Sequence, residues 1–146
     1  VYQRLLQTSL NLGIQNSEAE RAILTFSVRS SVNAEKTALI ERLVETGRQY
    51  GAAYSESGAY PAWEYRRQSP LRDVMVACYE RLYGKKPVVE AIHAGLECGI
   101  FSDRLKGLDA VSFGPQMHDI HTTRERLDIA STRRTWDFLL AVLAAL

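Results

Sequence analysis

The 146-residue chain has little of what marks several specialised classes of protein. Its two cysteines, Cys78 and Cys98, are too few for a disulfide framework, which favours the reducing cytoplasm. Basic and acidic residues nearly balance, at 18 and 17, so charge gives no attraction to nucleic acid or to an anionic membrane. The longest apolar run, residues 138–146, is about half of the roughly 20 residues that a membrane-spanning helix needs. We therefore expect a cytoplasmic protein with neither nucleic acid nor membrane as a partner.

What the chain does contain is an ordinary globular composition. It is 46% hydrophobic and 24% charged, which excludes a disordered or fibrous protein. The length allows one domain or parts of two. The sequence starts at Val1, within a patterned segment, and this start predicts a piece of a longer polypeptide.

The first 62 residues predict a small α+β unit. Residues 9–14 alternate polar and apolar, and 22–29 are rich in strand-forming residues, so a polar turn between them predicts a hairpin. Asn33 is the predicted N-cap of a helix with an apolar stripe, and Gly51 follows its end. Residues 52–60 predict a further strand.

The remaining residues, 63–146, predict the end of an α/β domain. A helix begins after the Ser69 cap with Pro70 at its first position, and Gly84 ends it. Two short apolar runs, 88–92 and 108–113, are typical of strands buried on both faces. We expect a short helix after the glycine-rich turn at 95–99, a polar loop at 114–121, an extended piece at 126–129 and a last helix capped by Ser131. The domain boundary falls near residues 62–69, where polarity rises.

Few residues in these segments could carry chemistry. His118 and His121 lie in the polar loop, and histidine is a common zinc ligand, although surface loops often contain histidine without a metal. His93 follows an apolar run, where a hydrogen-bonded core histidine is the simpler interpretation. Glu97 lies in a turn flanked by Gly95 and Gly99, which could serve close ligand approach or turn geometry alone.

Arg29 ends the second predicted strand. Its guanidinium could hold a carboxylate through two parallel hydrogen bonds, or it could be an exposed charge on an edge strand. A catalytic zinc usually takes three protein ligands, and the sequence offers no full set. From its residues alone, the chain therefore predicts part of a site.

Several longer motifs resemble one enzyme family. They are His93-Ala-Gly-Leu-Glu-Cys-Gly-Ile-Phe101, Ser112-Phe-Gly-Pro115 and His121-Thr-Thr-Arg-Glu-Arg-Leu127. Upstream, Thr8–Gly13, Val28–Ser31 and Ser57–Trp63 fit the same pattern in the same order. Together they resemble the C-terminal end of the aminoacylhistidine (Xaa-His) dipeptidases, which are zinc peptidases with a catalytic domain and an inserted lid.

The resemblance implies a role for particular residues. His121, the histidine that follows Gly-Pro in the family motif, would be a metal ligand, with Thr122 in place of the usual serine. Glu125 would be a structural residue that supports His121 without binding the metal itself. Arg29 would bind the terminal carboxylate of the substrate, and Glu97 and Gly99 would line its pocket.

The resemblance also implies what the chain lacks. The other zinc ligands and the general-base glutamate of the family belong to an N-terminal half, so no catalytic residue is expected within these residues. The expected fold class is α/β: an α+β lid portion at 1–62, then the C-terminal part of an α/β catalytic domain at 63–146. The full enzyme would bind two Zn²⁺, hydrolyse carnosine-like Xaa-His dipeptides and pair through its lid as a homodimer, whereas the chain alone would be inactive.

Two other hypotheses remain open. The chain could be a non-catalytic lid or dimerisation module, whose surface would come from residues 22–50. It could also be a small metalloprotein that uses His118 and His121 alone.

Overall fold

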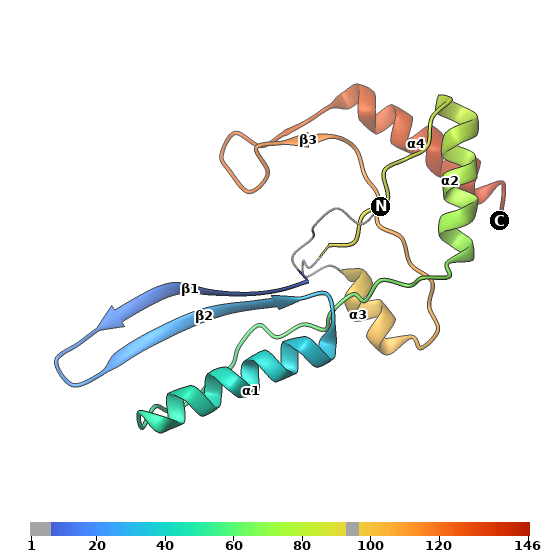
Figure 1. The fold of residues 1–146 in the computed structure, drawn as a ribbon. Coiled ribbons are helices and arrows are strands. Elements are labelled where there is room, and N and C mark those ends of the chain that lie inside the picture. Colours follow the sequence, from blue (N-terminus) through green and yellow to red (C-terminus); the bar gives the residue numbers. More distant parts are fainter. Residues whose placement is uncertain (1–6, 93–96) are drawn as a thin grey trace. The chain divides into compact units, whose positions relative to one another are not determined.

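The structure is a computed structural model that describes residues 7–92 and 97–146. His93 and Gly95 lie outside the described residues. The chain groups into two compact units: the first takes in the residues up to Tyr65 and the stretch from Glu90 to Leu108, and the second is Arg66–Val89 with Asp109–Leu146. Figure 1 shows the elements in order: β1 (Thr8–Ser17), β2 (Ala22–Ser30), α1 (Asn33–Gln49), α2 (Pro70–Tyr83), α3 (Glu97–Arg104), β3 (Met117–His118), β4 (Arg126–Leu127) and α4 (Ile129–Leu143).

The hairpin predicted from the alternating pattern is confirmed as β1 and β2. The strands pair antiparallel, with Leu10 opposite Val28 and Leu12 opposite Phe26, and the register shifts between Leu12 and Ile14. Because side chains alternate between the faces of a strand, one face of the hairpin carries Leu10, Leu12, Leu24, Phe26 and Val28, and the bulge moves Ile14 to the other face, opposite Thr25. The strands run further than predicted, because the turn is only the four residues that follow Ser17.

Helix α1 forms where the apolar stripe predicts it, but its cap differs from the prediction. The N-cap is Val32, so Asn33 is already the first helical residue. The Asn33 side chain instead accepts a hydrogen bond from Ala62 N–H at 2.8 Å, and its own N–H donates to Glu64 at 2.9 Å. Lys36 Nζ donates to the Tyr60 carbonyl. Residues 60–64 therefore hold the start of the helix, and Glu64 takes up one of its free backbone donors.

Helix α2 has both predicted ends. Ser69 Oγ accepts from Arg72 N–H at 3.1 Å, Pro70 follows at the first helical position, and Gly84 ends the helix with φ +66°. Asp109 adds a contact that the local sequence does not reveal: its carboxylate accepts from Ser69 Oγ at 2.7 Å and from Leu71 N–H at 3.0 Å. The start of the helix is thus fixed by a residue 40 positions away.

The hydrophobic core of the second unit lies between α2 and α4. Met75 and Cys78 on α2 meet Phe138 and Val142 on α4, all of them buried. The Phe138 ring packs edge-on against Phe113, with centroids 5.2 Å apart. Leu71, Val74, Tyr79, Tyr83 and Val111 border this cluster.

The cap of α4 lies three residues before its predicted position. Asp128 is the N-cap and accepts from Ser131 N–H at 2.7 Å. Ile129, predicted as extended, is helical. Buried Ser131 accepts from Gln116 N–H at 2.8 Å, so its hydroxyl joins the helix to the preceding loop.

Three predicted strands do not form. Residues 52–60, 88–92 and 108–113 have no strand structure. Val88 is 84% exposed, although its apolar segment suggested a strand buried on both faces. A strand of that kind needs a neighbour on each side to take up its backbone hydrogen bonds. The described residues supply no such neighbour to these segments.

The mixture of helices and strands agrees with the predicted α/β class. Both small sheets in the described residues are antiparallel and two-stranded. The chain changes unit between Tyr65 and Arg66, and Glu90–Leu108 groups with the first unit. The assignment of 1–62 to a lid and 63–146 to a catalytic domain remains a prediction. No helix in the described part of the chain is long and apolar enough to cross a membrane.

Candidate functional site

His121 lies in a loop that projects from the start of α4. Gln116 and Asp128 form the base of this loop, because Asp128 N–H donates to the Gln116 carbonyl at 3.0 Å. Above the base, β3 and β4 pair antiparallel, with His118 opposite Arg126. The loop therefore starts from a base joined to a helix N-terminus, which restricts its first and last residues.

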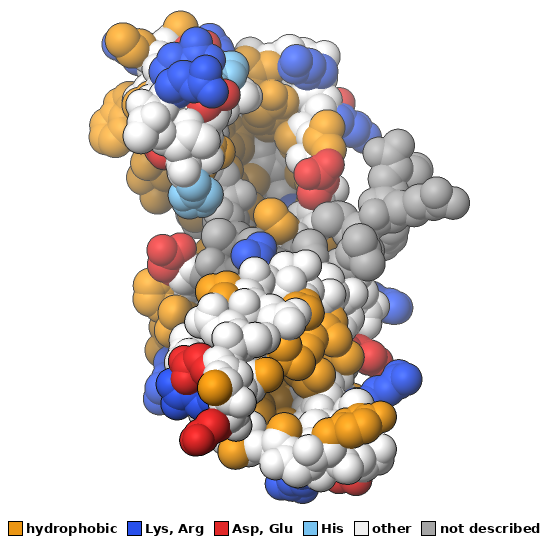
Figure 2. All heavy atoms as spheres, turned by 90° about the vertical axis from the view of Figure 1, so that its left-hand side faces the viewer, with side chains coloured by type: hydrophobic (Ala, Val, Ile, Leu, Met, Phe, Trp, Pro, Cys, Tyr) orange, Lys and Arg blue, Asp and Glu red, His pale blue; other side chains and the backbone are white. Residues whose placement is uncertain are grey.

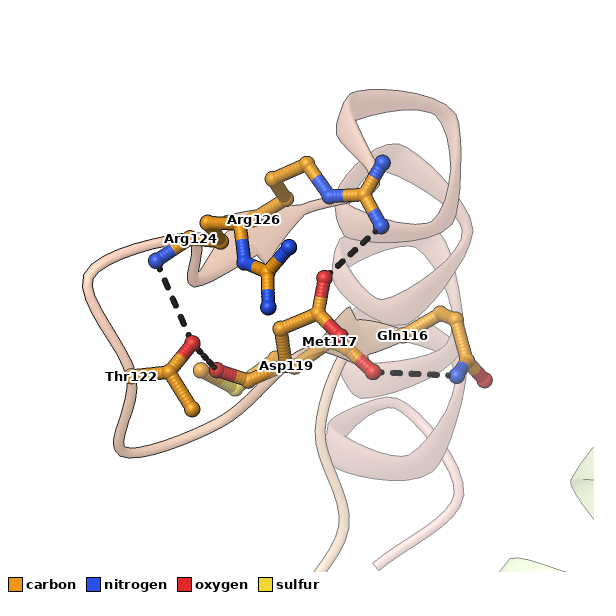
Figure 3. A network of polar contacts seen from close by, with 6 residues as sticks. All are labelled: Gln116, Met117, Asp119, Thr122, Arg124 and Arg126. Carbon is orange, nitrogen blue, oxygen red and sulfur yellow. Dashed lines mark hydrogen bonds and ion pairs between the residues drawn. The ribbon is translucent and has the colours of Figure 1, made fainter.

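Two consecutive turns close the loop. Thr122 N–H donates to the Asp119 carbonyl at 3.2 Å, and Glu125 N–H donates to the Thr122 carbonyl at 3.2 Å. Thr122 Oγ1 also donates to the Asp119 carbonyl at 2.7 Å and accepts from Arg124 N–H at 3.2 Å. An ion pair of 2.9 Å joins Arg126 Nη2 to Asp119 Oδ2 (Figure 3). Side-chain contacts thus reinforce both turns.

His121 has an unusual backbone conformation. Its φ is +65°, and Asp119 in the same loop has φ +52°. These are the only residues other than glycine with positive φ in the described chain. In the turn from Asp119 to Thr122, His121 occupies the third position, where a positive φ normally selects glycine or asparagine. A histidine held there costs backbone energy of the order of 1 kcal/mol, and such residues are concentrated at functional sites.

Glu125 contacts His121 directly, through the backbone. Its Oε2 accepts the His121 N–H at 3.0 Å. The carboxylate is therefore used to fix the backbone of the candidate ligand. His121 itself is exposed.

Arg29 lies near the end of β2, opposite Ser9 in β1. Its side chain is exposed and makes no hydrogen bond or ion pair with any described residue. A guanidinium in this state is available to a carboxylate ligand.

Glu97 and Gly99 lie together in the first turn of α3. Glu97 is exposed and its charge contributes to raising the pKa of the Cys98 thiol, after the larger effect of burial. Gly99 is buried, and a Cβ added to it would lie 3.0 Å from the Pro61 carbonyl oxygen and 3.4 Å from Trp63. The missing side chain therefore allows α3 to pack against residues 61–63. This is a packing reason for the glycine, whereas a role in substrate binding stays a prediction.

The predicted residues fall in both units. Arg29, Glu97 and Gly99 belong to the first unit, and His121 and Glu125 belong to the second. In the described residues no group of three or more His, Cys, Asp or Glu side chains could hold a metal ion. Taken by themselves these residues do not fit a zinc site, because His121 would supply only one of the required ligands.

Sequence reasoning missed Asp119 and Arg126. Both are ordinary charged residues, and their spacing of seven residues indicates no contact unless the loop is known to double back between β3 and β4. Thr122 was noted only as a departure from a motif, yet its hydroxyl bridges the two turns. The one available signal was the polar, turn-forming composition of residues 116–125.

Comparison with known proteins supports the resemblance seen in the sequence motifs. No family model matches the chain. The cytosol non-specific dipeptidase of Escherichia coli (strain K12) is 32% identical to it over 143 residues, which are 98% of the chain and 30% of that protein. The crystal structure of aminoacylhistidine dipeptidase from Vibrio alginolyticus matches 97% of the chain and 29% of its own, with a TM-score of 0.84 and 33% identity.

The chain thus spans about 30% of the length of the dipeptidases that it matches. The predicted resemblance is confirmed in sequence and in fold. Over nearly its whole length, this chain is similar to a part of the cytosol non-specific and aminoacylhistidine dipeptidases.

Proposed function

We propose that the chain is the C-terminal part of a metal-dependent dipeptidase of the cytoplasm that hydrolyses Xaa-His dipeptides. The similarity to dipeptidases over 98% of the chain supports a peptidase, and the name of the Vibrio relative supports the substrate class. In this proposal a preceding part of the same polypeptide supplies the remaining ligands and the general base. The chain contributes one metal ligand and part of the substrate pocket.

The observation that carries the proposal is the backbone of His121. A histidine at a turn position that favours glycine has no evident advantage for stability. A role for its imidazole as ligand to one of two zinc ions accounts for its presence. When bound, zinc polarises a scissile carbonyl and activates water. Glu125 then acts through the backbone, because its carboxylate holds the His121 N–H.

Arg29 is the proposed partner of the substrate's terminal carboxylate. Its exposed guanidinium has no partner among the described residues, which leaves both of its outer nitrogens free for a carboxylate. In this proposal Glu97 and Gly99 line the substrate pocket. Gly99 contributes by letting α3 pack closely on residues 61–63.

The test uses the full-length polypeptide that carries these residues, with His121→Ala and His118→Ala as a matched pair. Both histidines are exposed and lie in the same loop, but only His121 has a left-handed backbone. We expect His121→Ala to lower kcat for β-alanyl-histidine at least 100-fold and to lower bound zinc. His118→Ala should change either quantity less than about threefold. Equal effects of the two substitutions would contradict the proposal.

Two further assays examine the finer parts of the proposal. The 146 residues alone should not hydrolyse glycyl-histidine with added zinc, and robust turnover would contradict the view that the site is partial. In the full-length enzyme, Arg29→Ala should raise KM more than it lowers kcat. An unchanged KM would remove Arg29 from the substrate site.

A second candidate function is a lid or dimerisation module, in line with a homodimer of the whole enzyme. It is favoured by the apolar side chains that the hairpin exposes, which are Leu10, Leu12, Ile14, Ile23 and Leu24. Figure 2 shows hydrophobic side chains gathered at the surface on the face that it displays. Sedimentation velocity distinguishes the alternatives. A stable dimer of the chain supports this module, whereas a monomer at a concentration of about 100 µM argues against it.

A further inference from the structure

Helix α4 carries apolar side chains on two opposite sides. Phe138 and Val142 are buried against α2. Trp136, Leu140 and Leu143, which we call the outer face, share another side, because residues three or four positions apart are neighbours on a helix surface. Trp136 precedes Phe138 by two positions and Leu140 precedes Val142 by two, which is about 200° around the helix in each case. The three side chains of the outer face are 55%, 47% and 59% exposed.

Two apolar sides are more than a surface helix needs. A helix at the surface of a globular protein has one apolar stripe and a polar opposite side, whereas a helix that is apolar all round is enclosed by neighbours. Among the described residues, α2 covers one side of α4, and the side chains of the outer face stay about half exposed. We therefore expect a second neighbour for α4 from another part of the polypeptide.

The segment before the His121 loop also lacks a neighbour. Residues 108–113 have the apolar composition of a strand but no strand structure. Val111 borders the α2–α4 core and Phe113 packs edge-on against Phe138, so this segment already lies against the helix pair. The backbone groups of residues 110–113 form no hydrogen bond with the backbone of another described residue. Buried backbone N–H and C=O groups are almost always paired, so burial of this segment requires a neighbouring strand.

The length of the relatives shows that chain is available to supply both neighbours. The Vibrio structure contains the fold of this chain, with a TM-score of 0.84, within only 29% of its own length. A second copy is a weaker candidate for the neighbour. It would pair with one edge of residues 109–113, whereas a segment of this composition is typical of a sheet interior, where each strand has a neighbour on both edges.

We propose that the outer face of α4 and residues 109–113 are docking surfaces for the preceding part of the same polypeptide. Apolar side chains of that part cover Trp136, Leu140 and Leu143, and one of its strands pairs with residues 109–113. This inference rests on the proposed function only in its longer polypeptide. It does not depend on a metal at His121.

The test uses the full-length polypeptide with Leu140→Gln and Arg134→Gln as a matched pair. Both substitutions place glutamine on α4, at an outer-face position and at an exposed polar position. We expect Leu140→Gln to lower the melting temperature by at least about 5 °C, because it leaves a polar group in an apolar contact. Arg134→Gln should stay within about 1 °C of the parent. Equal shifts for the two variants overturn the docking of the outer face.

A conservative variant keeps the test valid if Leu140→Gln does not fold. Leu140→Met nearly keeps the volume and the apolar character of the side chain, so its melting temperature should stay within about 3 °C of the parent. Loss of folding with glutamine but not with methionine supports a buried outer face. Loss with both variants, while Arg134→Gln folds normally, also places Leu140 in a tightly packed contact.

Hydrogen exchange tests the strand without any substitution. In the full-length parent, the amides of residues 110–113 should exchange at least about 100-fold more slowly than those of Lys85 and Lys86, which lie in the exposed turn after α2. Exchange of residues 110–113 as fast as that of the two lysines overturns the pairing with a neighbouring strand.

Sedimentation velocity of full-length Leu140→Gln separates the preceding part from a second copy. The variant should keep the oligomeric state of the parent, and a change to a smaller species overturns the proposal in favour of a contact between copies. Failure of the proposed function has a different signature. In that case His121→Ala leaves bound zinc unchanged, while Leu140→Gln still lowers the melting temperature.

Discussion

The two units of the chain differ in how they bury their apolar residues. In the second unit α2 and α4 enclose Met75, Cys78, Phe138 and Val142, each with less than a tenth of its surface exposed. In the first unit the hairpin and α1 leave large side chains such as Leu12 and Leu24 about half exposed. Helices and strands are well formed in both units. The formation of secondary structure in this chain therefore does not by itself bury a hydrophobic core.

The difference follows from the shape of the faces that pack together in each unit. Two helices can pack their apolar stripes against each other and remove both from water. A two-stranded hairpin has a narrow face that one helix covers only in part. We therefore expect substitutions in the second unit to cost much more stability than equivalent substitutions in the first.

The largest expected effect is that of Phe138→Ala. Loss of a buried ring that contacts Phe113 and Tyr79 should lower the free energy of unfolding by about 3–5 kcal/mol. Phe101→Ala is the matched control, because Phe101 is 54% exposed on α3 and should cost less than about 1 kcal/mol. Urea unfolding followed by the fluorescence of Trp63 in the first unit and Trp136 in the second measures both, and similar losses would remove the distinction between the units.

A smaller loss is expected from Ser69→Ala at the start of α2. The hydroxyl accepts from Arg72 N–H and donates to Asp109, so its removal should cost about 1 kcal/mol. Ser55→Ala, at an exposed position outside any helix or strand, should change the free energy of unfolding by less than about 0.5 kcal/mol. Equal urea midpoints for the two variants would show that the cap does not stabilise the helix.

Asp109 should make the second unit sensitive to acid. Burial alone would raise the pKa of its carboxyl, but the hydrogen bonds from Ser69 and Leu71 and the charges of Arg66 and Arg72 lower the pKa overall. A lowered folded-state pKa means that the contribution to stability is complete above about pH 4 and is lost as the pH falls through the folded-state pKa.

The comparison that tests this is Asp109→Asn against the parent chain. The parent should be more stable by about 1 kcal/mol at pH 7, and the difference should shrink as the pH falls below about 4. A constant difference between the parent and Asp109→Asn from pH 7 to pH 3 would contradict the assignment.

The smallest effect is expected on the open face of the hairpin. Leu24→Thr keeps a strand-forming residue at a position that is 51% exposed, so stability should change by less than about 0.5 kcal/mol. Leu71→Thr at the border of the α2–α4 core should cost about 1 kcal/mol or more. If Leu24→Thr costs as much as Leu71→Thr, the face is covered in solution, which would favour self-association of the chain.

The sequence predicted those elements whose signals are local. Ser69, Pro70 and Gly84 mark both ends of α2 within a few residues, and the hairpin follows from alternation over each strand. Segments 88–92 and 108–113 carry the composition of strands but lack a partner, and composition cannot supply one. The site was predicted as a set of residues from motif resemblance, while the contacts that join them were not.

Two capping predictions failed for the same reason. Asn33 was expected to cap α1, but Glu64 and Ala62 take its polar groups from 29 to 31 residues away. Ser131 was expected to cap α4, but Asp128 does so, and the Ser131 hydroxyl holds Gln116 instead. A polar side chain near a helix start can accept a hydrogen bond from any of several backbone N–H groups. Which of them it binds depends on the segment that the fold packs beside it.

By itself, the sequence determined the hairpin, the helices and the likeness to dipeptidases, because periodicity, turn residues and motifs are local properties. Tertiary structure decided which polar groups meet. Asp109 contacts the start of α2, and Asp119, which follows β3, pairs with Arg126 in β4. It also decided that His121 has a positive φ, since a backbone conformation that costs energy persists only where surrounding contacts hold it.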